Sequence, residues 1–479
     1  MMSNSLTSGY VLGLSSSSAG LTSGGLLNIF ADGTPTSSWT GDLVAIEYDN
    51  TSTNIDGNGL KVGLIGSLGD GSGTALNVTT AQVGLGALAL RVNDDGSYID
   101  TTPFVVSSTG NVGIGTASPL SKLVVNSDAY STIELQYNGN SVLDIFSNIS
   151  SNIFIGLDSG SAITTGVGNV SLGDNALSAT TSGTSNTAIG YYALDSNVAK
   201  QGSTAIGYEA MRYADSTTTQ GLSYNTAIGY QALAGNGTSS LNTGVNNTVV
   251  GHQSMTQNTS GSYNSALGSN TLLNNITGQY NIAIGYNALF TNSGKNASIA
   301  IGYEAMRYAD STTNNTTSGN IALGYQALIG SSTASNNTGT NNIAVGYQSL
   351  YGNTSGGENV LIGSYSGYSN STGNQNVAIG KDSFKSNVAR SNNVAIGFGA
   401  MLYASNSSTN EATFNTALGS YSFMGSSVAS NNSGINNTTI GGYSGYSMTS
   451  GSYNVFLGYQ SGYNITTGSS NVLLGKSAG

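Results

Sequence analysis

The strongest constraint on this chain is one short pattern, Asn-x-x-aliphatic-Gly, which recurs through its last 330 or so residues. The steps between successive copies are 17, 17, 17, 22 and 22 residues, and this series of five, which sums to 95, repeats along the chain. A period near 20 residues indicates one small structural unit per repeat, stacked so that neighbours bury a shared core. The glycines of the 18 copies are Gly156, Gly173, Gly190, Gly207, Gly229, Gly251, Gly268, Gly285, Gly302, Gly324, Gly346, Gly363, Gly380, Gly397, Gly419, Gly441, Gly458 and Gly475.

A longer repeat of 95 residues contains the short one. The stretch AIGYEAMRYADSTT occurs identically at Ala205–Thr218 and Ala300–Thr313, and a diverged copy begins at Ala395. Two coils in every five carry five extra residues, which are mainly Ser, Thr, Asn and Gly. We expect these additions to form surface loops outside the strand ladder.

Within each copy the residue types are consistent. The residue before the glycine is always Ile, Leu or Val, and Asn stands four before it in 16 of 18 copies, with Ser203 and Ser298 as the exceptions. Asn tolerates turns and can bond to an Asn stacked above it, and Gly allows a bend where no Cβ fits. The sequence therefore predicts a coil of two short strands and two turns. Representative structural positions are Asn186, Asn281, Asn376, Gly190, Gly207, Gly285 and Gly302.

The predicted fold class is all-β, a parallel β-solenoid or β-roll of 18 coils over 151–479. Each coil offers only two or three large apolar side chains, which is thin for an independent core. We therefore expect a homotrimer around a central axis, with rows of Ala, Ser and Tyr meeting between the chains. Upstream we expect a flexible or docking tail over 1–30, small β-rich modules over 31–127 and a connector over 128–150. LVAIEY, LKVGLIG and SYIDTTPFVV predict strands there.

Three stretches also resemble segments of two known families. NTAIGYYAL (Asn186–Leu194) and NVAIGKDSF (Asn376–Phe384) are similar to the head repeats of trimeric autotransporter adhesins. That resemblance implies a left-handed parallel β-roll trimer, although those heads usually have shorter coils. GNVGIGTASPLSKLVV (Gly110–Val125) resembles a segment common in phage tail fibres.

Composition argues against several functions. Charged residues make up 7%, the net charge is −11, and no basic stripe exists, so we expect no nucleic-acid partner. Cysteine is absent, which excludes disulfides and thiolate metal sites. The sequence has no run of 18 apolar residues, so we expect no membrane span. The segment before Lys61 lacks the basic start of a signal peptide.

Cofactor and catalytic signals are weak. The segment from Gly84 to Ala89 matches a GxGxxA dinucleotide fingerprint, but no helix signal follows it. His252 is the only histidine and occupies a slot usually filled by Tyr. We therefore expect no catalytic residue, no cofactor and no metal ligand that the sequence can place.

A row of tyrosines is the candidate binding feature, because eight copies carry Tyr directly after the motif glycine. One interpretation is packing between coils or chains. The other is an aromatic platform for glycan rings, with nearby Asn and Ser as hydrogen-bond partners. The eight are Tyr191, Tyr208, Tyr230, Tyr286, Tyr303, Tyr325, Tyr347 and Tyr459.

These features favour a non-enzymatic fibre protein for attachment. We expect a phage tail fibre or virion appendage that binds host-surface glycans or a protein receptor and joins a larger assembly through its N-terminal region. The alternative is a cell-surface adhesin or extracellular filament subunit. A third possibility, ice binding, needs a Thr-x-Thr array in every coil, whereas the Thr pairs here are irregular.

Overall fold

The structure is a computed structural model that describes residues 152–479, apart from 215–217, 238–241, 310–314, 404–408 and 429–430, and six strands between residues 88 and 147. The chain divides into two units, 1–90 and 91–479, and nearly all the described residues belong to the second. The expected tail over 1–30 and the expected strands over 43–48 and 60–66 lie outside the described residues.

Six short strands precede the solenoid. β2 pairs antiparallel with β3, which pairs parallel with β4, and β5 and β6 form an antiparallel hairpin. β6 then pairs antiparallel with the first solenoid strand, so the segment expected as a connector extends the solenoid sheet. Their bounds are β1 (Leu88–Val92), β2 (Phe104–Ser107), β3 (Val112–Ile114), β4 (Leu123–Val125), β5 (Ser131–Tyr137) and β6 (Asn140–Ser147).

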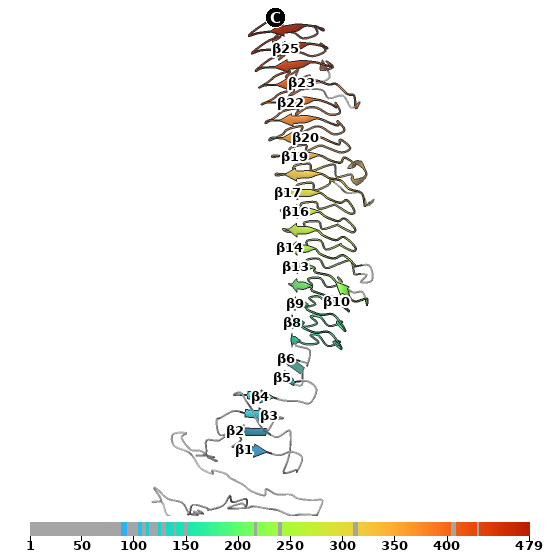
Figure 1. Cartoon of the computed structure of the whole chain (residues 1–479), viewed down its shortest axis with the longest axis vertical. Coiled ribbons are helices and arrows are strands. Elements are labelled where there is room, and N and C mark those ends of the chain that lie inside the picture. Colours follow the sequence, from blue (N-terminus) through green and yellow to red (C-terminus); the bar gives the residue numbers. More distant parts are fainter. Residues whose placement is uncertain are drawn as a thin grey trace, which may run out of the picture. The chain divides into compact units, whose positions relative to one another are not determined.

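The repeats form a parallel β-solenoid, as predicted, with one three-residue strand per coil directly before each motif glycine (Figure 1). Successive strands pair in register, as Ala205 does with Ala227. The strands are β7 (Ile153–Ile155), β8 (Val170–Leu172), β9 (Thr187–Ile189), β11 (Thr204–Ile206), β13 (Thr226–Ile228), β14 (Thr248–Val250), β15 (Ser265–Leu267), β16 (Ile282–Ile284), β17 (Ile299–Ile301), β18 (Ile321–Leu323), β19 (Ile343–Val345), β20 (Val360–Ile362), β21 (Val377–Ile379), β22 (Val394–Ile396), β23 (Thr416–Leu418), β24 (Thr438–Ile440), β25 (Val455–Leu457) and β26 (Val472–Leu474).

The expectation of two strands per coil is wrong, because the leg after the glycine is a series of turns. In most coils the second and fourth residues after the glycine have left-handed backbone angles, as Tyr192 (φ 54°) and Leu194 (φ 52°) do. A strand cannot contain such residues. The leg still bonds to the next coil, for example through the Leu194 amide, which donates to the Ala210 carbonyl at 2.9 Å.

The motif glycines stack in one row, as predicted. Gly207 has a φ of 133°, which a side chain strains, and a Cβ there would lie 2.4 Å from the carbonyl oxygen of Gly229. The predicted Asn ladder is also present. The Asn376 side-chain amide donates to Asn359 Oδ1 at 3.1 Å and to the Arg390 carbonyl at 2.9 Å.

The core is filled from two positions in each coil. The residue two before the glycine points inward and is usually Ala, and the residue four after it is usually Leu, Met or Phe. The two sizes compensate within a coil. Where the later position is Gly, the earlier residue is usually large, and a Cβ on Gly160 or Gly367 would clash with Phe154 or Leu361 respectively.

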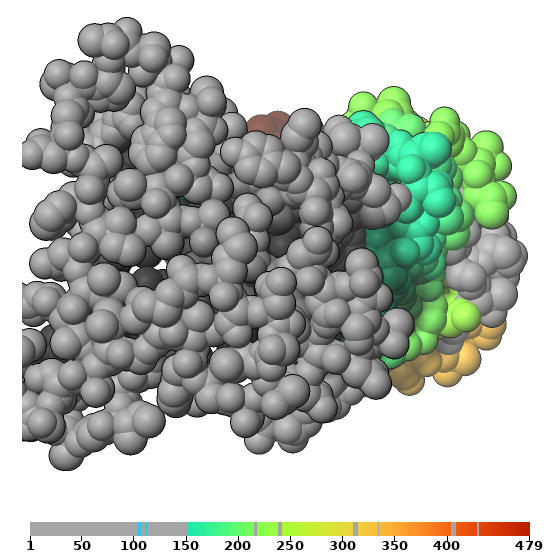
Figure 2. Space-filling view, turned by 90° about the horizontal axis from the view of Figure 1, so that it is seen from below, coloured from blue at the N-terminus to red at the C-terminus, as the bar shows by residue number. Residues whose placement is uncertain are grey.

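The longer coils are fastened to the coil below. β10 (Lys200–Gln201) pairs with β12 (Gly221–Leu222), and isolated bridges occur at the equivalent places in the next two super-repeats. The extra residues therefore do not lie wholly outside the ladder. In each super-repeat, a buried asparagine of the second long coil also donates a hydrogen bond to the coil below. Asn242 donates to the Tyr213 carbonyl at 2.8 Å, and Asn337 and Asn432 hold the equivalent places. Seen from below, green and orange segments extend beyond the teal first coils (Figure 2).

Candidate binding surfaces

The outer side of the solenoid sheet carries two aliphatic columns. Because strand side chains alternate, the inward Ala leaves the residues one and three before the glycine pointing outward. Ile282 is 37% exposed and Ile301 is 38% exposed, although both are β-branched apolar residues. We call these two outward columns the apolar face. The first column is aliphatic in every coil, and the second contains Ile, Val, Thr or Ser.

The predicted tyrosines stack on one another along the edge of the apolar face. Tyr191, Tyr208 and Tyr230 form one stack with ring centroids 5.6 and 5.2 Å apart, and His252 extends it at 5.1 Å. His252 thus replaces a tyrosine in the stack. Tyr286, Tyr303, Tyr325 and Tyr347 form a second stack with spacings of 5.0 to 5.4 Å.

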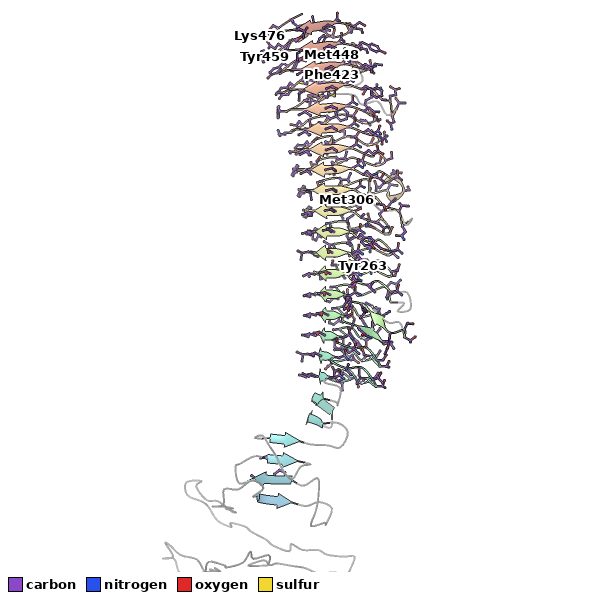
Figure 3. The ribbon with its side chains drawn as sticks, in the orientation of Figure 1. Tyr263, Met306, Phe423, Met448, Tyr459 and Lys476 are labelled. Atoms are coloured by element: carbon purple, nitrogen blue, oxygen red, sulfur yellow. The ribbon has the colours of Figure 1, made fainter. Side chains whose placement is uncertain are left out.

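This stacking bears on the two interpretations of the tyrosine row. The interpretation as packing between coils applies to the seven stacked tyrosines, since neighbouring rings cover each other's faces. A sugar ring cannot lie on a covered face, so the tyrosines inside a stack offer a ligand only their ring edges and hydroxyls. Tyr459 stands apart, 6.1 Å from Tyr443 in an edge-to-face contact, and projects from the edge at which the strands end (Figure 3).

A polar ladder lies beside the tyrosine stacks and was not found from the sequence. Gln231 donates to Glu209 at 2.7 Å, and Gln253 donates to Gln231 at 2.9 Å. Arg212 pairs with Glu209 and lies over the Tyr192 ring at 4.3 Å. The same ladder recurs as Glu304, Gln326 and Gln348, with Arg307 as the cation. The identical YEAMRY stretches were the available signal, because each supplies the Glu and Arg of one ladder.

The negative charges in these ladders act on the neighbouring tyrosines. The Glu209 carboxylate raises the pKa of Tyr208 above its ordinary value of 10.0, and Glu304 raises the pKa of Tyr303 in the same way. Loss of hydration raises the pKa of Tyr347. All three phenols are therefore harder to ionise in the folded chain.

The described part of the chain lacks two further features. It contains no group of three or more His, Asp or Glu side chains able to hold a metal ion. It also contains no helix long and apolar enough to cross a membrane.

The geometry defines the class of the protein as a parallel β-solenoid with an outward apolar face and a stacked aromatic edge. No protein-family model, no protein of known function and no solved structure matches the chain.

Proposed function

We propose that this chain is a non-enzymatic structural fibre for attachment, and that its working form is a homotrimer assembled through the apolar face. The observation that carries the proposal is the continuity of that face. An aliphatic side chain points outward directly before the glycine in all 18 coils. Soluble monomers rarely expose such long contiguous apolar surface, which is typical of interfaces.

The size of the apolar face suits a stable assembly. Seventeen steps of about 4.8 Å give a length of roughly 80 Å, and two columns with their side chains are roughly 10 Å wide. The resulting area of about 800 Å² is what each partner of a stable complex contributes. The resemblance to trimeric adhesin heads supports three copies rather than two.

An attachment role is supported by the continuous hydrogen-bonded ladder of the coils and by the upstream resemblance to phage tail fibres. In this proposal the fibre belongs to a virion or an extracellular appendage, joins it through the N-terminal region and contacts host-surface glycans. A cell-surface adhesin or extracellular filament subunit is the alternative, because the same face and the same repeats serve either setting.

Light scattering on the purified full chain tests the assembly. We expect three times the 48.3 kDa chain mass. The triple variant Ile282→Asn, Ile301→Asn and Ile362→Asn makes the apolar face polar and should shift the mass towards the monomer. The matched control, Ile276→Asn with Val428→Asn, alters exposed apolar residues outside that face and should remain trimeric. A stable folded monomer of the natural chain contradicts the proposal.

A further inference from the structure

The aromatic edge has one coil in which a ring is missing and both neighbouring rings are uncovered. Ser269 occupies the slot after Gly268, between His252 in the coil below and Tyr286 in the coil above. His252 stacks only downward, on Tyr230, and Tyr286 stacks only upward, on Tyr303, among the ring contacts of the described residues. Two aromatic faces thus lack a ring partner at one position, where Ser269 stands.

Other ends of ring stacks in this column have a covering side chain, either an aromatic residue in the next slot or Lys381, whose Nζ lies 5.3 Å from the Phe398 ring. Tyr192 contacts Tyr191 at 4.3 Å, and Tyr365 contacts Tyr347 at 5.3 Å. Tyr421 covers Phe398 at 5.0 Å, again edge to face. In the Ser269 coil that next slot holds Asn270, which has no ring.

The missing position has room for one ring. Rings in adjacent coils lie 5.0 to 5.6 Å apart, so rings two coils apart are separated by about 10 Å. One ring inserted midway would have the spacing of a tyrosine in the intact stack. Leu267, in the same coil as Ser269, is 50% exposed, whereas Val250 and Ile284 on either side are less exposed.

The surroundings select the chemistry of that ring. The polar column beside the slot holds Gln253, Asn270 and Asn287, which are neutral amides, and Glu304 is the next charge above them. Aromatic faces are electron-rich and attract the polarised C–H bonds of a sugar ring. The Gln253 side-chain amide and the Ser269 hydroxyl offer hydrogen bonds to sugar hydroxyls, whereas the Oδ1 atoms of Asn270 and Asn287 are buried.

We propose that the Ser269 coil binds a neutral pyranose ring between His252 and Tyr286. The proposal rests on the glycan-binding role proposed above and places it at one site, which we call the Ser269 slot. It makes the rest of the tyrosine column a structural stack.

Saturation-transfer NMR on the full chain tests the slot, with the methyl glycosides of glucose, galactose, mannose and N-acetylglucosamine as probes. Ser269→Tyr fills the slot with the residue that eight other coils carry there, so the fold should be kept and sugar binding lost. Ser269→Ala, the matched control, should bind as the natural chain does. His252→Ala and Tyr286→Ala should each weaken binding about two- to tenfold, the share of one aromatic contact.

The outcomes separate this inference from the proposed function. Sugar binding by the Ser269→Tyr variant equal to that of the natural chain overturns the slot, and so does a natural chain that binds none of the four glycosides. Selective binding of a free indole instead of a sugar overturns the pyranose assignment. A trimer that attaches to glycan-coated surfaces equally well with Ser269→Tyr leaves the fibre proposal standing and removes only the slot.

Discussion

At the scale of single residues, most positions of a coil are fixed by backbone demands. The glycine row needs a φ near 133° and has no room for a Cβ, and the buried Asn must bond to the coil on either side. The tyrosines differ, because their slot demands only a flat ring that stacks on its neighbours. His252 fills the slot equally well for that reason.

Because several stacked phenols have raised pKa values, the folding stability of the chain should decrease at alkaline pH. Tyr208, Tyr303 and Tyr347 have pKa values raised above 10.0, so the unfolded chain loses these protons at lower pH than the folded chain. Stability is therefore full below pH 10 and falls as the pH rises through the folded pKa values. We expect the thermal midpoint to decrease between pH 9 and pH 11, as measured by circular dichroism.

The double variant Glu209→Gln and Glu304→Gln is the matched control for this pH effect. It removes the charges that raise the pKa of Tyr208 and Tyr303, so the decrease of the midpoint with pH should become shallower. The comparison concerns slopes, since the loss of two ion pairs lowers the midpoint at every pH. A midpoint that stays constant up to pH 11 in the natural chain would contradict the expectation.

The sequence was most informative where one residue type has one local role. Motif glycines and asparagines predicted the row and the ladder, because a bend without Cβ and a buried amide leave few alternatives. It did not show that the tyrosine faces are covered, since a packed ring and a free ring occupy the same slot. The gap at Ser269 follows only from the stacking contacts and from the aromatic residues that cover three stack ends elsewhere in the column.

At the scale of one coil, the core depends on the sum of two side-chain volumes. Leu361 and Gly367 reverse the usual small-then-large order, and a Cβ on Gly367 would lie 1.9 Å from the Leu361 side chain. In the coil below, Ala344 and Leu350 fill the same space in the usual order. The sequence alone does not show this pairing, because the two positions meet only in the folded coil.

Exchanging the large and the small residue at positions 361 and 367 tests whether the two side-chain volumes compensate for each other. Leu361→Ala should cost about 2–5 kcal/mol through a cavity, and Gly367→Leu about 1–3 kcal/mol through overpacking. The double variant should lose less than the sum, because it recreates the common Ala and Leu pair. Denaturant unfolding measures all three. Leu361→Ala combined with Gly462→Leu, in a different coil, is the control, and its effects should add.

At the scale of the whole molecule, the solenoid grows by coils, and each coil contacts only its neighbours. One of the two strands expected in each coil occurs in every repeat, but the Ala row, expected between chains, points into the coil, and the Ile row points outward. A thin coil can place either set inside, and the narrow space between its two legs selects Ala. The same choice leaves the larger aliphatic residues outside and gives the apolar face its length.

A stack of this kind should tolerate removal of a complete super-repeat. Deleting residues 302–396 joins Ile301 to Gly397, which holds the equivalent place 95 residues later, and removes five strands, β18 to β22. The shortened chain should fold, remain trimeric and be about 24 Å shorter by electron microscopy. Its Ser269 slot is untouched, so sugar binding should persist.

Deleting 302–397 instead places Phe398 in the glycine row, where a Cβ has no room, and should prevent folding across the junction. Equal stability of the two deletions would show that register along the glycine row does not hold the stack together.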